Sequence, residues 1–256
     1  MSDDTSNRNV ALLIDADNAS HLTLDPVLTV LAELGTVNVR RVYGNWSKPG
    51  LKGWQEMSLK HGIEPQQQFD LTKGKNATDM KMTIDAMDLL FRGRIDGFGL
   101  MSSDSDFMPL ATRIRQDGIP VYGFGTSRTP QGFRQACTRF IDVGQLDETS
   151  APLSPSPPPV AGEIQAPAPV RAPIAPKAKQ PIDADVIKLL IDAYNAVKRD
   201  EKGYASLAEV GQLAGNRSSF DARNYGFSRL SDLIKTVPNF QAERREDGRM
   251  FLKRLR

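Results

Sequence analysis

Hydrophobic and polar positions follow different patterns in the two halves of the chain. In the first half, short apolar runs such as residues 9–14 alternate with amphipathic stretches, which predicts buried parallel strands joined by helices. Pro65 places the third of these strands near a sheet edge. The pattern predicts an α/β domain, a parallel sheet with helices on both faces, in which we expect strands at 9–14, 37–43, 63–69, 97–101, 119–124 and 139–142 and helices at 24–34, 54–60, 78–91, 107–116 and 133–138. The helix at 78–91 carries an apolar face formed by Met80, Ile84, Met87 and Phe91.

The second half lacks this alternation. It predicts three helices, at 183–198, 207–214 and 228–236, and then a hairpin of residues 240–244 and 249–253 around an Asp-Gly turn. Ser206 opens a capping-box pattern, and Ser228 is the expected N-cap of the third helix. Three helices followed by such a hairpin indicate a small winged-helix domain.

A proline-rich stretch separates the two halves. Ten of the 17 prolines lie in residues 150–181, in a segment with few large apolar side chains. Such a composition buries too little surface to offset chain entropy, so we expect an extended spacer, with a PxxP-type ligand as the alternative. The predicted organisation is a domain at 8–146, a linker at 147–181 and a second domain at 182–256.

Overall composition is that of a globular protein. The 256 residues are 39% hydrophobic and 25% charged, which argues against a disordered, collagen-like or membrane chain. Cys137 is the single cysteine, so no intrachain disulfide forms, and the two histidines lack zinc-ligand spacing around it. The polar start of the chain does not resemble a signal peptide, and no apolar run approaches the ~18 residues of a membrane span. We therefore predict a cytoplasmic protein with no membrane partner.

Charge is unevenly distributed. The net charge of +2 combines −3 over residues 1–150 (16 basic, 19 acidic) with +5 over residues 151–256 (17 basic, 12 acidic). An acidic half beside a basic half is compatible with an acid-rich metal site joined to a module that binds a polyanion. Ordinary charge scatter is the favoured explanation from charge alone.

Aspartates gather where the predicted strands end. Asp15 and Asp17 follow the first strand, Asp104 and Asp106 follow the strand at 97–101, and Asp79 lies in the first turn of a helix. Ligands of open parallel sheets bind at the carboxyl ends of the strands, and clustered carboxylates need a cation such as Mg²⁺ or Mn²⁺. Each aspartate also has a purely structural explanation, as a helix cap or as a partner of the helix dipole.

Three segments resemble the motifs of the NYN domain, a PIN-like nuclease family, in its LabA-like branch. They are VALLIDADN at 10–18, TDMKMTIDAM at 78–87 and MSSDSDFMPL at 101–110. The resemblance implies a PIN-like fold and cleavage of RNA that depends on Mg²⁺ or Mn²⁺. It assigns metal binding and catalysis to Asp15, Asp79, Asp104 and Asp106, with Asn18 and Ser103 as secondary polar residues. It leaves the roles of Asp17 and Asp85 open, and the spacing of Asp85 from Asp79 favours a structural or solvated position.

Basic residues near these motifs are candidates for binding RNA phosphates. Lys73 and Lys75 precede Asp79, and an exposed basic loop is the alternative explanation. A second candidate wall contains Arg40, Arg41 and Lys48, with Tyr43 and Trp46 as stacking aromatics or as packing residues.

The second half resembles the OST-HTH/LOTUS domain. The matching segments are VIKLLIDAY at 186–194, GYASLAEVG at 203–211 and FDARNYGFSRLSDLI at 220–234. The resemblance implies RNA binding or, as in some animal members, binding of a protein partner. Candidate phosphate contacts are Arg217, Arg223, Arg229, Lys235, Arg244, Arg245 and Arg249, each of which has a solvated surface charge as its alternative.

The leading hypothesis is a metal-dependent endoribonuclease that an RNA-binding domain targets. A non-catalytic RNA-binding or regulatory adaptor is the second hypothesis, and a phosphatase-like hydrolase is a weaker third. The RNA target, endo- versus exo-cleavage and the oligomeric state, including a homodimer, stay open from the sequence.

Overall fold

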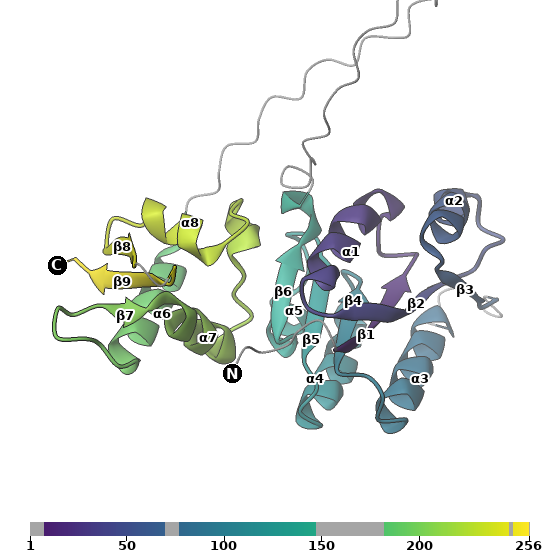
Figure 1. Cartoon of the computed structure of the whole chain (residues 1–256). Helices are drawn as coiled ribbons and strands as arrows, with labels where there is room; N and C mark the ends of the chain where they lie inside the picture. Colours follow the sequence, from purple (N-terminus) through teal and green to yellow (C-terminus); the bar gives the residue numbers. More distant parts are fainter. Residues whose placement is uncertain (1–7, 70–76, 147–181, 246–247, 256) are drawn as a thin grey trace, which may run out of the picture.

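We analysed a computed structural model of the chain, which describes residues 8–69, 77–146, 182–245 and 248–255. The predicted linker and the candidate residues Lys73 and Lys75 lie outside these ranges. Figure 1 shows two bodies, an α/β body formed by the first half and a smaller one formed by the second.

A six-stranded parallel sheet forms the centre of the first body, as the sequence predicts. Its spatial order is β3-β2-β1-β4-β5-β6, so the chain builds one side of the sheet outward from β1 and then the other side from β4. The position between β1 and β4 is therefore the topological switch point, where parallel sheets open a crevice at their carboxyl ends. The strands are β1 (Asn9–Asp15), β2 (Thr36–Gly44), β3 (Glu64–Gln67), β4 (Gly97–Met101), β5 (Val121–Gly125) and β6 (Arg139–Asp142).

Helices cover both faces of this sheet, because alternate residues of the buried strands point in opposite directions. Val10, Leu12 and Ile14 of β1 pack into one core, beneath α1 (Leu24–Ala32) and α2 (Lys52–His61). Ala11 and Leu13 pack into the other, beneath α3 (Ala77–Phe91), α4 (Met108–Gln116) and α5 (Gln131–Ala136). The central strand is thus buried on both sides, which explains its continuous apolar run. Pro65 lies in β3, and β3 is an edge strand, as expected.

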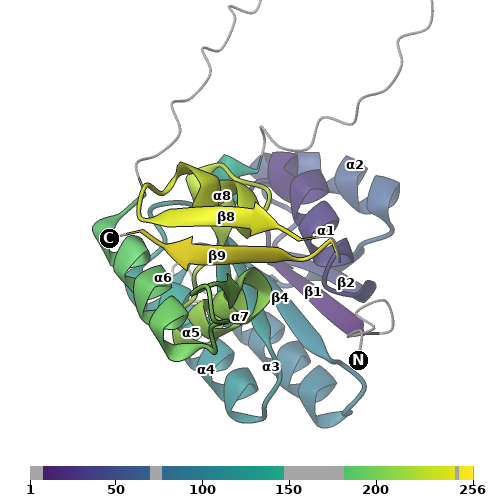
Figure 2. The same ribbon diagram turned by 60° about the vertical axis from the view of Figure 1, so that its left-hand side comes forward.

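The second body has the predicted winged-helix arrangement. Its helices are α6 (Ala184–Ala196), α7 (Leu207–Arg217) and α8 (Leu230–Thr236), and they pack with a sheet of order β7-β9-β8. The strands are β7 (Ala205–Ser206), β8 (Phe240–Arg244) and β9 (Met250–Arg254), of which β8 and β9 pair as the antiparallel hairpin. Gly248 has φ 78°, a value that glycine adopts most readily, in the turn between them. Figure 2 shows the hairpin crossing above α7.

Three local predictions are wrong. The apolar face of α3 that includes Met80, Ile84 and Phe91 points to solvent, with exposed fractions of 65%, 54% and 72%, because the opposite face, centred on Met82 and Ala86, packs on the sheet. Ser206 occupies the N-cap position of α7, but its side chain makes no cap hydrogen bond, so the capping box does not form. Arg229 rather than Ser228 occupies the N-cap position of α8.

No helix within the described ranges is long and apolar enough to cross a membrane.

Candidate active site

The switch point between β1 and β4 holds a buried carboxylate. Asp15 is the last residue of β1 and is fully buried. Its two carboxylate oxygens accept four hydrogen bonds: from the backbone N–H groups of Asp17 and Asn18, at 3.1 and 3.3 Å, from Asn18 Nδ2 at 2.8 Å and from Ser102 Oγ at 2.7 Å. Burial still raises the pKa of Asp15, although these hydrogen bonds lower it. The site therefore fixes the orientation of a carboxylate that it desolvates.

Ser102 is a residue of this candidate site that sequence reasoning missed. It is fully buried directly after β4, and its hydroxyl both donates to Asp15 and accepts the backbone N–H of Asp104 at 3.0 Å. Ser103, the predicted residue, instead approaches the loop after β5, where its hydroxyl accepts the backbone N–H of Thr126 at 3.1 Å. The pairing of β1 with β4 explains the contact: Ile14 lies opposite Met101, so the next residues, Asp15 and Ser102, also lie opposite each other.

Asp104 and Asp106 lie in the turn that leads from β4 to α4. Asp104 accepts the backbone N–H of Asp106 at 2.9 Å and caps the 3₁₀ turn Ser105–Phe107. Asp104 therefore caps the turn that precedes α4, whereas α4, the helix with Leu110, has Phe107 at its N-cap position. One oxygen of Asp104 makes the capping bond, so capping leaves the other able to take a further partner.

Asp79, in the first turn of α3, lies near these aspartates. Burial is the largest cause that raises its pKa, from 3.8 to about 6, and the charges of Asp15, Asp104, Asp106 and Asp17 add to the shift in that order. An aspartate whose pKa responds to four other aspartates lies in a strongly negative field. This edge of the sheet therefore collects five carboxylates.

The five carboxylates lie within electrostatic range of one another but do not form a ready-made ligand set. Within the described ranges, no three aspartate, glutamate, histidine or cysteine side chains are arranged as a metal-ligand group. Their chemistry nevertheless fits a hard divalent cation, because oxygen donors in a negative field are what Mg²⁺ and Mn²⁺ prefer. Asp15, Asp79, Asp104 and Asp106 are the residues that could hold it.

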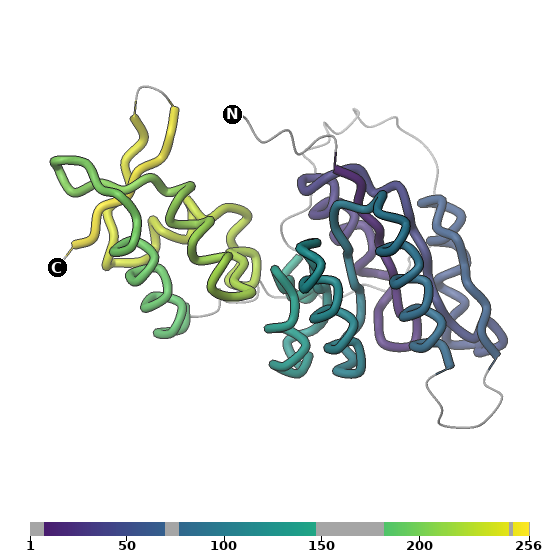
Figure 3. Tube along the Cα trace, turned by 90° about the horizontal axis from the view of Figure 1, so that it is seen from below, coloured from purple at the N-terminus to yellow at the C-terminus, as the bar shows by residue number. Residues whose placement is uncertain are grey.

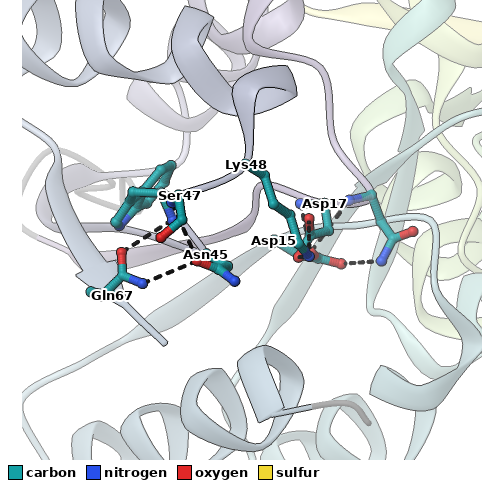
Figure 4. Close-up of polar contacts among 8 residues, drawn as sticks. Asp15, Asp17, Asn45, Ser47, Lys48 and Gln67 are labelled. Atoms are coloured by element: carbon teal, nitrogen blue, oxygen red, sulfur yellow. Dashed lines mark hydrogen bonds and ion pairs between the residues drawn. The ribbon is translucent and has the colours of Figure 1, made fainter. Parts of the chain in front are cut away.

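A polar rim lies beside Asp15 at the ends of β2 and β3 (Figure 4). Lys48 Nζ pairs with Asp17 Oδ1 at 3.2 Å, so the second aspartate of the β1 motif has a cationic partner. Asn45 Oδ1 accepts Gln67 Nε2 at 3.3 Å, and Gln67 Oε1 accepts the backbone N–H of Trp46 at 3.1 Å. These amides and Lys48 form a polar and positively charged wall, in which only Lys48 and Trp46 were candidates from the sequence.

Arg40, Arg41 and Tyr43 lie elsewhere. Arg40 donates to the carbonyls of Val37 and His61, and Arg41 pairs with Glu64 at 3.0 Å and with Asp85 at 3.4 Å. Tyr43 is fully buried, so the proposed stacking role for it is wrong. Arg41 as a substrate-binding residue stays a prediction.

Asp85 belongs to a second buried polar cluster. It is 6% exposed, and its carboxylate contacts Lys81 Nζ at 2.6 Å, Tyr43 Oη at 3.1 Å and Arg41 Nη1 at 3.4 Å. Two cations and a hydroxyl from the chain itself therefore satisfy this charge. The structural interpretation of Asp85 agrees with these contacts.

The candidate phosphate contacts of the second body have mixed surroundings. Arg223 pairs with Asp221 and Glu33, Arg245 pairs with Asp200 and lies over the ring of Phe251, and Lys235 pairs with Asp232. Arg217 and Arg229 are exposed, so both stay candidate phosphate contacts.

Comparison with known proteins places both halves. The NYN domain family matches residues 9–147, and the OST-HTH/LOTUS domain matches residues 179–252. An uncharacterised protein of Methanocaldococcus jannaschii is 30% identical over 138 residues, which are 52% of each chain, so this chain spans about half the length of that relative.

Two solved structures show weaker likeness. A protein of unknown function from Vibrio parahaemolyticus is 20% identical with a TM-score of 0.46 and covers 56% of this chain and 96% of its own. An uncharacterised protein from Nitrosomonas europaea, solved in solution, is 27% identical with a TM-score of 0.27 and covers 37% of this chain and 93% of its own. The match over more than half of the sequence is the informative one: the chain belongs to the NYN domain family of PIN-like proteins, and it carries an OST-HTH/LOTUS domain after the NYN domain.

Proposed function

We propose that this protein is a divalent-metal-dependent ribonuclease that hydrolyses phosphodiester bonds of RNA, with the acidic cluster of the NYN domain as its active site. The observation that carries the proposal is the position of Asp15 and Asp104 at the carboxyl ends of β1 and β4, the topological switch point, where Asp79 lies close enough for their charges to raise its pKa. A fold that gathers so much negative charge at a ligand-binding edge gains most from a bound cation. The family supports the proposal, because NYN domains are PIN-like nuclease domains.

In this proposal Asp15, Asp79, Asp104 and Asp106 hold Mg²⁺ or Mn²⁺. A bound cation of this kind supplies Lewis-acid activation of water and neutralises charge on the phosphate. Asn18 and Ser102 hold the Asp15 carboxylate through hydrogen bonds of 2.8 and 2.7 Å, so its orientation needs no reorganisation during the reaction.

The polar rim binds the RNA on the side of β2 and β3. Lys48 lies against Asp17 and presents positive charge next to the acidic cluster, where it can attract a phosphate adjacent to the one that is cleaved. Ser103 is a proposed further contact, as are Lys73 and Lys75, which lie outside the described residues. The OST-HTH domain supplies additional RNA affinity, and a protein partner is its alternative ligand.

The test is a cleavage assay on a mixed panel of RNAs, with Mg²⁺, with Mn²⁺ and with EDTA. We expect cleavage with either metal and none with EDTA. Asp104→Asn keeps the size of the side chain and its capping oxygen while removing the charge, so it should abolish cleavage and leave the fold intact. Asp88→Asn is the matched control, because Asp88 is exposed and should retain wild-type activity.

Including a covalently closed circular RNA decides between endo- and exo-cleavage, since only an endonuclease cuts it. Full activity of Asp104→Asn would refute the proposed site.

A non-catalytic RNA-binding adaptor is the second candidate. It is favoured by the four protein hydrogen bonds that already satisfy Asp15 and by the capping bond of Asp104. The adaptor binds the same RNA panel without producing fragments at any metal concentration.

A further inference from the structure

The strand β6 ends the sheet, and it would be expected to leave hydrogen-bonding groups open. It pairs with β5 on one side only. The groups on the other side need a partner, because an unpaired strand edge invites association with other chains. The tube view in Figure 3 shows the second body next to the teal segments that end the first one.

The OST-HTH domain provides that partner through the segment 219–225. Asn224 Nδ2 donates to the carbonyl of Phe140 at 2.7 Å, and Asn224 Oδ1 accepts the backbone N–H of Asp142 at 2.7 Å. The backbone N–H of Phe140 donates to the carbonyl of Ser219 at 3.2 Å. In a parallel sheet, one residue of the neighbouring strand bonds to residues i and i+2 of its partner in the same way. The Asn224 amide therefore replaces the backbone of a missing seventh strand.

The local structure holds Asn224 in position. Asp221 accepts the backbone N–H of Arg223 at 2.9 Å and caps the 3₁₀ turn Ala222–Tyr225, and Gly226 ends this turn with φ 77°. The turn presents the Asn224 side chain away from the winged-helix core, toward β6. A side chain on such a short capped turn loses little further entropy when it docks.

An ion pair across the interface lies next to this contact. Arg223 binds Asp221 of its own domain at 3.0 Å and also Glu33, just after α1 of the NYN domain. The side chains of Arg223 and Asp221 are only 14% and 6% exposed. Glu33, the partner across the interface, is 60% exposed. Half-exposed ion pairs contribute little, so this pair adds only modestly to the docking.

Beside these contacts the interface opens into a cleft. A cleft of about 1040 Å³ lies between the domains, with Pro120, Tyr122 and Arg139 on one wall and Gln212 and Asn216 on the other. Because the domains do not pack closely here, the contacts made by the segment 219–225 carry the association.

We propose that the OST-HTH domain docks in cis on the edge strand β6 of the NYN domain, held by the hydrogen bonds of Asn224, so that the two domains move as one body. The occupant of the edge is segment 219–225 of the same chain. This inference is independent of the nuclease activity, because the backbone groups of β6 that Asn224 binds take no part in the acidic cluster.

The test measures the distance between spin labels on the two domains of the full chain. Gln116→Cys and Glu201→Cys introduce label sites at exposed positions, and the native Cys137 is buried and so unreactive. We expect a single narrow distance distribution for the double-labelled protein. Asn224→Asp has the same size but replaces the donor to Phe140 with a carboxylate that repels its carbonyl, so the distribution should broaden several-fold.

Two controls keep the result interpretable. Arg229→Ala removes an exposed charge of the same domain and should leave the distribution narrow. Circular dichroism of each variant checks that both domains stay folded, and amide exchange at Asp142 should become faster in Asn224→Asp while exchange in β4 does not change.

A broad distribution in the parent protein, or a narrow one in Asn224→Asp, would overturn the proposal. Two further measurements distinguish docking in cis from docking between two copies: the label distance after excess unlabelled protein is added, and the mass from light scattering. Docking in cis predicts an unchanged distance and a monomeric mass. A dimeric mass, with a label distance that changes when unlabelled protein is added, would show docking between copies instead.

Discussion

Two buried aspartates of the NYN domain, Asp15 and Asp85, have opposite electrostatic surroundings. Lys81 and Arg41 neutralise Asp85, and Tyr43 donates a further hydrogen bond to it. Asp15 receives four hydrogen bonds from neutral groups, and, among the residues that the structure describes, no lysine or arginine pairs with it. A buried charge with cationic partners is satisfied within its own chain, whereas we propose that a buried charge among other acids binds an external cation. We therefore assign Asp85 a structural role and propose a functional one for Asp15.

The largest expected effect concerns activity. Asp79→Asn should reduce metal-dependent RNA cleavage by orders of magnitude, because it removes one charge from the proposed cation site. Initial rates on one RNA at saturating Mg²⁺ measure the effect, with Asp88→Asn on the exposed side of the same helix as the control. Equal loss of activity in both variants would mean that general charge, and not the cluster, matters.

The structural carboxylate should show the reverse behaviour. Asp85→Asn leaves Lys81 and Arg41 without their partner, and we expect a loss of about 2 kcal/mol in the free energy of unfolding, reduced from the fully buried case because both cations are partly exposed. Urea unfolding measures it, and the folded fraction should cleave RNA at the wild-type rate. Unchanged stability would contradict the assigned role of this cluster.

Ser102 tests the orientation of Asp15. Ser102→Ala removes the hydrogen bonds to Asp15 and to the backbone of Asp104, so metal affinity or activity should fall about 10–100-fold, the usual cost of losing a group that orients a ligand. A Mn²⁺ titration of the cleavage rate separates the two contributions. Ser103→Ala is the comparison variant: as a proposed RNA contact that does not orient Asp15, Ser103 should have the smaller effect, and a larger effect there would restore the assignment made from the sequence.

The smallest expected effect is a gain of stability that depends on pH. The folded-state pKa of Asp79, about 6, exceeds the ordinary value of 3.8, so its charge costs stability. The cost is absent below about pH 4, grows as the pH rises and is complete above about pH 6. In EDTA, Asp79→Asn should therefore raise stability by about 1 kcal/mol at pH 7, a value discounted for solvent screening, and by nothing near pH 4. Thermal unfolding at the two pH values gives the result, and a constant difference would contradict the charge argument.

The elements of the fold were predictable because their patterns are local. The apolar run of β1 and the proline in β3 specify a central and an edge strand directly. Family motifs then indicated Asp15, Asp79, Asp104 and Asp106, and the structure brings these side chains within electrostatic range of one another. The domain boundaries and the roles of the four aspartates stay predictions.

The remaining features depend on tertiary contacts. Periodicity shows that α3 has an apolar face but not which face meets the sheet, so the stripe containing Met80 and Phe91 was misassigned. Lys48 pairs with Asp17 across 31 positions of sequence, and Asn224 meets Phe140 across 84. No spacing rule links such residues, because only the packed sheet brings them together.

The central claim is that the edge of the sheet around Asp15 binds a divalent cation. Substoichiometric Mn²⁺ added to isotope-labelled protein tests it directly, because a paramagnetic ion broadens the amide signals nearest to it. The account predicts selective broadening at Asp17, Asn18, Asp79 and Ser103–Asp106, and its loss in Asp79→Asn. Broadening centred elsewhere, or the same pattern in that variant, would contradict it.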